Sequence, residues 1–123
     1  KTQQQEYGPY FSKFMAWRIG QPEGYYTANV RFPRRDLLQI TADQVAGYLR
    51  YKAYGRSDPS PNDRPNKCRS SSLLQYKKAI SFFMPQQEGW NVASNSGNPT
   101  KAKAVNKVIK DVKQAEVRKQ GKE

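Results

Sequence analysis

The chain has 123 residues, 36% of them hydrophobic, and 22 Lys and Arg against ten Asp and Glu give a formal net charge of +12. This length fits a single domain over residues 1–123, and its 15 aromatic residues argue against a disordered basic tail. The absence of His and the presence of one Cys exclude Ser-His-Asp and Cys-His catalysis, His-containing zinc sites and an internal disulfide. We therefore expect no catalytic residues, cofactor or metal, and an anionic partner such as nucleic acid.

The expected compartment follows from two features. No apolar run approaches the roughly 18 residues that span a membrane, so we expect no membrane partner. Because we expect no catalytic residues, we also expect no small-molecule substrate. The lone Cys68 suits a reducing cytosol or nucleus, and a nucleic-acid partner favours the nucleus. The chain begins with Lys1 rather than Met, so we expect it to be a fragment of a longer protein.

The first predicted helix covers residues 8–20. Its apolar residues recur at roughly helical spacing and are Tyr10, Phe11, Phe14, Met15 and Trp17. Pro9 suits a first helical turn, and Gly20 with Pro22 would end the helix. Residues 25–32 could form a short extended run that Pro33 stops.

The second predicted helix covers residues 41–54. Thr41 and Gln44 form a capping-box pattern, in which each side chain satisfies a backbone N–H, and Gly55 is a suitable C-terminal stop. The core-facing stripe is expected to comprise Val45, Tyr48, Leu49 and either Lys52 or Ala53. Residues 56–67 are rich in Pro, Asp and Asn and predict a long loop.

The third predicted helix covers residues 70–84. Ser70 and its two neighbours are all good N-caps, Ser72 with Gln75 reads as a second capping box, and Pro85 ends the helix. Its core stripe is expected to comprise Leu73, Tyr76, Ile80 and Phe83. Residues 85–98 predict another loop, with Trp90 and Val92 as its anchors to the core.

The fourth predicted helix covers residues 99–119. Its apolar residues follow 3, 4 and 3 spacing and are Ala102, Val105, Ile109 and Val112. From residue 99 to 123 there are eight Lys and Arg against three Asp and Glu, so lysines fill much of the remaining circumference. The pattern as a whole predicts an all-α fold, a four- to five-helix bundle with long loops.

Candidate DNA contacts gather at the starts of the last two helices. A helix N-terminus offers N–H groups and a positive dipole end to phosphate. At the third helix we expect Gln75 near base edges, and phosphate contacts from Arg69, Ser70, Ser71, Ser72, Lys77 and Lys78. At the fourth helix we expect contacts from Asn98, Thr100, Lys101, Lys103 and Lys107, with Lys110 and Lys113 as weaker candidates.

Each of these candidates has an alternative interpretation. The serines could only cap their helix, and the lysines could form an ordinary solvated face. Arg31, Arg34 and Arg35 could clamp a phosphate or belong to an ordinary linker. Tyr25 and Tyr26 could stack on bases, although we favour core packing for both.

Three segments carry a family resemblance: residues 41–49, 70–83 and 97–110. Together with their order along the chain, they resemble the N-terminal core-binding (SAM-like) domain of tyrosine recombinases and phage-type integrases, in particular the Crypton-like relatives of diatoms. The resemblance extends from about residue 7 to residue 121. The long loop at 56–67 departs from compact members of that family, because it lengthens the connection between the second and third helices.

The resemblance implies a mechanism. The family's domain clamps one face of duplex DNA, while a separate C-terminal domain supplies the catalytic Arg, Lys, His and Tyr. By position, Ser71, Ser72 and Gln75 would enter the major groove, and Ser12, Lys13 and Trp17 would approach the neighbouring groove or backbone. The fourth helix would join protomer contacts in a homo-oligomer on DNA.

The expected function is therefore a DNA-binding module of a tyrosine-recombinase-like protein, with the catalytic domain outside this chain. About six phosphate contacts would give a log–log salt slope near −5. The rival interpretation is a basic structural or RNA-associated protein in a ribonucleoprotein particle, which would prefer structured RNA.

Overall fold

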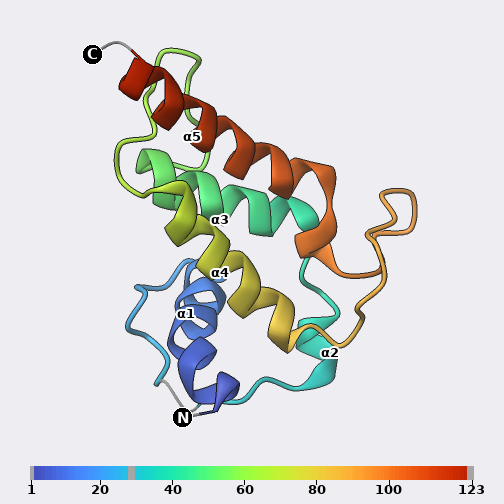
Figure 1. Ribbon diagram of the computed structural model, residues 1–123. Helices are drawn as coiled ribbons and strands as arrows, with labels where there is room; N and C mark the ends of the chain where they lie inside the picture. The colour runs from blue at the N-terminus through green and yellow to red at the C-terminus, as the bar shows by residue number, and fades with distance from the viewer. Residues whose placement is uncertain (1, 28–29, 122–123) are drawn as a thin grey trace.

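The computed structural model describes residues 2–27 and 30–121, and within them all regular structure is helical (Figure 1). The all-α prediction is therefore confirmed, with one isolated bridge between Asn91 and Ser96 as the sole extended pairing among these residues. The helices are α1 (Gln3–Arg18), α2 (Arg34–Leu37), α3 (Ala42–Tyr54), α4 (Ser70–Phe83) and α5 (Lys103–Gly121), with a 3₁₀ turn at Pro99–Lys101 before α5.

The helices pack in two pairs that α4 connects. α3 lies beside α5, α1 lies against α4, and α4 also contacts both α3 and α5. In Figure 1, α3 and α5 run together in the upper half, and α4 descends from them to α1 in the lower half. One hydrophobic core draws on α1, α3, α4 and α5, so these helices form a single packed unit.

The core uses the stripes that the sequence predicts. In α3 the predicted Val45, Tyr48, Leu49 and Ala53 are buried, whereas Lys52, the alternative to Ala53, is partly exposed. The predicted residues of the last stripe are all buried, three of them in α5 and Ala102 just before it, as are three of the four in α4, while Phe83 is partly buried. Val108 is an additional buried residue on α5. Thr41 and Gln44 form the predicted capping box, and Gly55 ends α3 with φ 85° in the left-handed region. These features confirm the second predicted helix in detail.

The first helix begins earlier than predicted. Thr2 caps α1, accepting from the Gln5 backbone N–H at 3.1 Å, while the Gln5 side chain accepts from Thr2 N–H at 3.0 Å. Pro9 therefore lies inside the helix, where it lacks an N–H to donate to the preceding turn. Treating Pro9 as a first-turn residue was wrong, because the upstream capping box decides where the helix starts.

The starts of the last two helices also differ from prediction. Arg69 is the N-cap of α4 and provides no side-chain cap, so the expected Ser72–Gln75 box does not form. The predicted helix at 99–119 begins instead as a 3₁₀ turn, in which the Asn98 side chain accepts from Thr100 N–H, and α5 follows from Lys103. The 3₁₀ turn therefore starts at the side chain of Asn98, and α4 starts where the distant Glu116 accepts from the Ser70 N–H.

Several loop predictions need correction. Val92 is 80% exposed and anchors nothing, whereas Trp90 packs against the core as expected. No strand occurs in the described part of residues 25–32, and the remaining two positions, 28 and 29, lie outside the described residues. Tyr26 packs against the core, but Tyr25 is 56% exposed. Arg34 and Arg35 lie in α2 rather than in a loop.

Candidate nucleic-acid interface

A stripe of basic residues runs along α5 beside its buried stripe. Lys103, Asn106, Lys110 and Lys113 recur at 3, 4 and 3 spacing, and all four are exposed. This spacing is that of one helical face. The stripe is offset by one residue from the buried Ala102, Val105, Ile109 and Val112, so it follows the edge of the helix–core contact.

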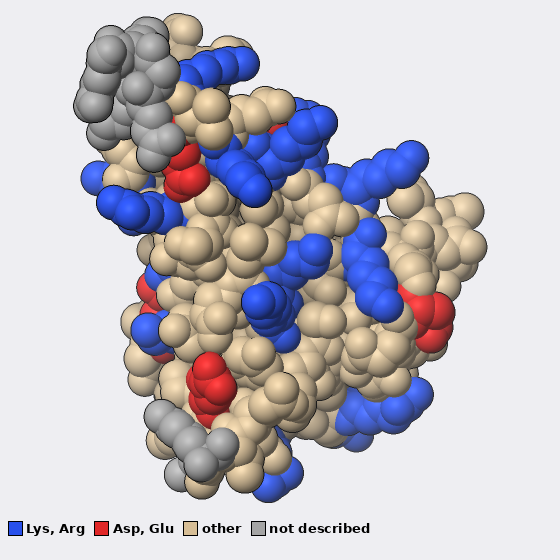
Figure 2. Space-filling model, in the orientation of Figure 1, with Lys and Arg blue, Asp and Glu red and all other residues tan. Residues whose placement is uncertain are grey.

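This stripe adjoins α4. Lys77 of α4 donates from Nζ to Oδ1 of Asn106 at 2.6 Å, which places the stripe next to the exposed side of α4. Arg69 and Lys78 are exposed on that helix or at its cap. We call the surface formed by Arg69, Lys77, Lys78, Lys103, Lys110 and Lys113 the α4–α5 face. Figure 2, in the orientation that shows α4 and α5, has many basic and few acidic side chains.

The acidic groups near the α4–α5 face are already engaged. Asp111 pairs with Lys107 at 2.9 Å on α5. Glu116 accepts from Ser70 at the start of α4, and hydrogen bonds from the Ser70 backbone and side chain hold its pKa below the usual range. Among the described residues, the ion pairs found involve none of Lys103, Lys110 and Lys113. The α4–α5 face therefore presents positive charge to solvent, which Glu116 offsets in part near Arg69 and Lys113.

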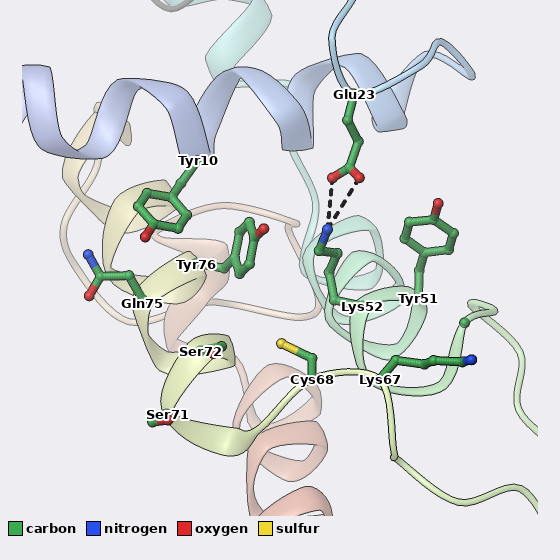
Figure 3. Close-up of a pocket in the computed structure, with 11 residues that line it drawn as sticks. Tyr10, Glu23, Tyr51, Lys52, Lys67, Cys68, Ser71, Ser72, Gln75 and Tyr76 are labelled. Atoms are coloured by element: carbon green, nitrogen blue, oxygen red, sulfur yellow. Dashed lines mark hydrogen bonds and ion pairs between the residues drawn. The ribbon is translucent and has the colours of Figure 1, made fainter.

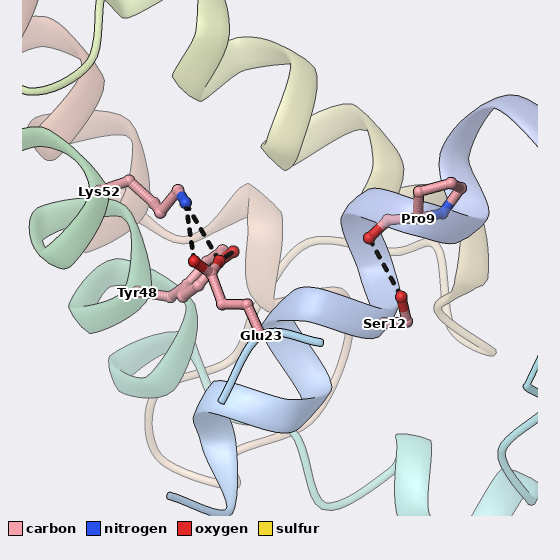
Figure 4. A network of polar contacts seen from close by, with 5 residues as sticks. All are labelled: Pro9, Ser12, Glu23, Tyr48 and Lys52. Carbon is pink, nitrogen blue, oxygen red and sulfur yellow. Dashed lines mark hydrogen bonds and ion pairs between the residues drawn. The ribbon is translucent and has the colours of Figure 1, made fainter. Parts of the chain in front are cut away.

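Four predicted contact residues are buried and do not reach the surface. Ser12 is 4% exposed and donates to the Pro9 carbonyl at 3.1 Å (Figure 4), and Ser70 is 9% exposed and bonds Glu116. Asn98 and Thr100 are 0% and 1% exposed. Asn98 Oδ1 accepts from the backbone and side chain of Thr100, and its amide donates to Ser81 Oγ at 3.0 Å. These side chains hold the fold together, so predicting them as DNA contacts was wrong.

The remaining predicted basic residues are accessible but differ in their partners. Lys101 Nζ donates to the Gln87 carbonyl, and Lys107 pairs with Asp111. Lys77 is half-buried, and burial lowers its pKa. Lys13 is exposed on α1, near enough to Glu23 to help lower the pKa of that carboxyl. Trp17 packs against Tyr48 with ring centroids 5.3 Å apart, rather than projecting toward a groove.

The other three predicted residues of α4 line a pocket instead of a protruding tip. Ser71, Ser72 and Gln75 border a cavity of about 640 Å³ between α1, α3 and α4. Three tyrosines from those helices also line it: Tyr10, Tyr51 and Tyr76 (Figure 3). The sequence predicted the serines and the amide but not this enclosure, because the tyrosines come from three separate helices.

One wall of the pocket contains a partly buried polar network (Figure 4). Glu23 accepts from Tyr48 Oη at 2.7 Å and from Lys52 Nζ at 3.1 and 3.2 Å. Burial favours the neutral forms, yet the hydrogen bonds and charges within the network leave the Glu23 pKa lowered and the Lys52 pKa raised. Burial and Glu23 raise the pKa of Tyr48. All three shifts point away from neutral pH, so this network is suited to holding the wall in place rather than to transferring protons.

Lys110 and Lys113, which the sequence offers as weaker candidates, share the 3, 4 and 3 spacing of Lys103 and Asn106 and are exposed with them. Every helix in the described ranges is too short or too polar to cross a bilayer, and these ranges hold no cluster of three Cys, Asp or Glu able to bind a metal.

No protein-family model, characterised protein or solved structure matches the chain.

Proposed function

We propose that this chain binds duplex DNA through the α4–α5 face. The observation that carries the proposal is the stripe formed by Lys103, Lys110 and Lys113, which is exposed and makes no ion pair among the described residues. The stripe spans about 15 Å along the helix, since each residue adds about 1.5 Å. Basic side chains repeated over this length suit successive backbone phosphates, which supply most of the affinity in non-specific DNA binding.

The α4 side extends the same surface. Arg69 and Lys78 would add phosphate contacts, while the Lys77–Asn106 bond keeps the two helices in register. With the other five basic residues of the face each contacting a phosphate, the expected log–log salt slope is about −4.5. Binding would be mainly electrostatic, because the side chains available on this face are long and basic and carry little base discrimination.

The resemblance to recombinase core-binding domains supports a narrower version of the proposal. In that version the module belongs to a nuclear tyrosine-recombinase-like protein, assembles as a homo-oligomer on DNA and relies on a catalytic domain outside this chain. Its support is the order of segments 41–49, 70–83 and 97–110. Full-length sequence containing downstream Arg, His and Tyr motifs would support this version, and a stop codon there would contradict it.

The decisive experiment compares two variants with equal loss of charge. One carries Lys103→Gln, Lys110→Gln and Lys113→Gln. The control carries Arg31→Gln, Arg34→Gln and Arg35→Gln, which are also exposed but lie on and before α2. Fluorescence anisotropy with labelled duplex DNA at several salt concentrations would give the affinity and the salt slope of each.

We expect the lysine variant to lose about three units of salt slope, roughly 0.9 for each lost phosphate contact, while the arginine control keeps that of the unmodified chain. Equal weakening by both variants would mean that only total charge matters, and the proposed face would be wrong. The same titration with duplex RNA tests the rival ribonucleoprotein role. Equal or tighter binding to RNA would favour that role over DNA binding.

A further inference from the structure

A second, smaller cavity lies where α1, residues 30–32, α2 and the end of α4 meet. Figure 1 shows α2 close to the C-terminal end of α4 in the lower part of the molecule. We call this cavity the Phe82 groove, after the exposed ring in its lining. We propose that the Phe82 groove binds an acidic segment of a partner protein by enclosing one aromatic side chain of that segment. The inference does not depend on duplex binding, because no residue of the groove belongs to the α4–α5 face.

The size and apolar lining of the groove suit a single ring. Phe11 is 3% exposed, stacks on Phe83 with ring centroids 4.6 Å apart and meets Phe32 edge to face at 5.7 Å. Val30 and Leu37 add aliphatic surface. The volume is about 190 Å³, and an apolar cavity of roughly 150 Å³ is enough to hold one benzene ring. The groove therefore has room for one aromatic side chain.

The rim of the groove leaves apolar surface in water. Phe82 is 42% exposed, although its ring lies 5.6 Å from that of Tyr7 and 5.0 Å from that of Phe83. A side chain entering the groove would cover part of the exposed Phe82 ring, so apolar surface would leave water on both partners. Aromatic side chains inserted into pockets of this kind supply much of the affinity in protein interfaces.

The polar groups of the lining favour a phenyl ring over a nucleobase. Gln4, Ser12 and Arg31 are the polar side chains that line the groove, and the Ser12 hydroxyl already donates to the Pro9 carbonyl at 3.1 Å. Gln4 and Arg31 are both exposed, whereas the inner surface is made of apolar side chains. A base buried there would leave polar edge atoms without partners, which costs free energy. A Phe side chain has no such atoms.

The charge beside the groove indicates an acidic segment. Arg31 lines the groove, and Arg34 lies three positions before the lining residue Leu37, on the same side of α2. Both arginines and the neighbouring Arg35 are exposed, and the ion pairs found among the described residues involve none of the three. No Asp or Glu of the described chain lines the groove, and Asp36 on α2 can offset only one of the three positive charges. Several charges beside a cavity for one ring are complementary to a peptide with carboxylates on either side of an aromatic residue.

Short fluorescein-labelled peptides provide the test. One consists of Asp and Glu with a central Phe, the second has Ala in place of Phe, and the third keeps Phe but has Gln in place of the acidic residues. Anisotropy with the whole chain should show the acidic Phe peptide binding about tenfold more tightly than the Ala peptide, because one ring is buried. The Gln peptide should bind roughly tenfold more weakly than the acidic Phe peptide. Equal affinities of the Phe and Ala peptides, or no binding of the Phe peptide at about 1 mM protein, would overturn the proposal.

A pair of variants on α4 tests where the ring binds. Phe82→Ala removes one wall of the groove, and Leu74→Ala is the matched control, since Leu74 is 40% exposed on the same helix and lies outside the groove. We expect Phe82→Ala to weaken the acidic Phe peptide by about fivefold and to leave the Ala peptide unchanged. Leu74→Ala should change neither, with circular dichroism confirming that both variants are folded. Equal effects of the two variants on the Phe peptide would mean that it binds elsewhere.

A second pair of variants tests the charge. Replacing Arg31, Arg34 and Arg35 by Gln should weaken both acidic peptides by roughly tenfold. The control has the same loss of charge in the exposed loop after α3 and carries Arg56→Gln, Arg64→Gln and Lys67→Gln. It should change either affinity by less than about twofold. Equal weakening by both variants would show that total charge alone attracts the peptide, which would contradict the groove.

A nucleic-acid strand is the alternative occupant, and the same variants distinguish it. Single-stranded oligodeoxyadenylate should bind Phe82→Ala as well as it binds the unmodified chain. If Phe82→Ala weakened the strand as much as the Phe peptide, the groove would take a base, and the proposed protein partner would be wrong. Failure of duplex DNA binding would leave the peptide result intact, because duplex binding is tested with variants of α5.

Discussion

Glu116, near the end of α5, caps Ser70, the first residue of α4. Its two carboxylate oxygens accept from the Ser70 backbone N–H at 2.8 Å and from the Ser70 hydroxyl at 2.7 Å. A carboxylate from the chain itself thus occupies the position where the sequence suggested a DNA phosphate. This contact ties α5 to α4. Because Glu116 accepts from the first N–H of α4, the helix does not depend on a capping hydrogen bond from the side chain of its N-cap residue, Arg69.

Removing the carboxylate should destabilise the protein. We expect Glu116→Ala to lower the free energy of unfolding by about 1 kcal/mol, because the first N–H of α4 loses its acceptor and the helix dipole its counter-charge. Thermal unfolding should show a Tm lower by roughly 4 °C. Gln114→Ala on the same helix is exposed and should leave Tm unchanged, and an equal loss in both variants would refute the capping role.

The same contact predicts a dependence on pH. The folded pKa of Glu116 lies below its value in the unfolded chain, so the stabilisation is complete above the unfolded pKa and is lost as pH falls through the folded pKa. We expect the stability difference between the unmodified chain and Glu116→Gln to be largest at neutral pH and to shrink on acidification below about pH 4.5. Urea unfolding at several pH values would measure it. If the stability difference between the two proteins stayed constant across this pH range, the negative charge of Glu116 would not contribute to stability.

The Tyr48–Glu23 hydrogen bond should contribute to stability. Tyr48 is fully buried and donates to Glu23 Oε2 at 2.7 Å. We expect Tyr48→Phe to lower the free energy of unfolding by about 1–2 kcal/mol, because the acceptor is ionised. Glu23→Ala should cost more, since it leaves the buried Tyr48 hydroxyl without an acceptor. Tyr25→Phe, at a 56% exposed position, is the control, and denaturant titrations should show no change there.

Gly97 should resist substitution. Its φ is +100°, and a Cβ at this position would overlap the carbonyl oxygen of Gly89. We expect Gly97→Ala to cost at least about 2 kcal/mol, from backbone strain together with displacement of the 86–98 loop. Gly24→Ala has open space around it and should stay within about 0.5 kcal/mol of the unmodified chain. Comparable Tm values for both variants would show that the close approach to Gly89 is absent in solution.

The sequence by itself determined the features that depend on neighbouring residues. The α3 capping box joins Thr41 to Gln44 three positions away, and the buried stripe of α5 follows from helical spacing. Such patterns act within one or two turns, so the all-α fold and three of the core stripes could be predicted. The start of α1 was also encoded, in Thr2 and Gln5, although Pro9 was the more conspicuous signal.

Tertiary structure alone decided which polar residues reach solvent. Ser70 and Glu116 are 46 positions apart, and Asn98 bonds Ser81 across 17, so no local pattern could reveal that Ser70 and Asn98 are buried. The pocket likewise needs Tyr10, Tyr51 and Tyr76 from three helices. Whether a serine, an asparagine or a tyrosine binds a partner or holds the fold depends on what packs against it, and distant segments of the chain settle that.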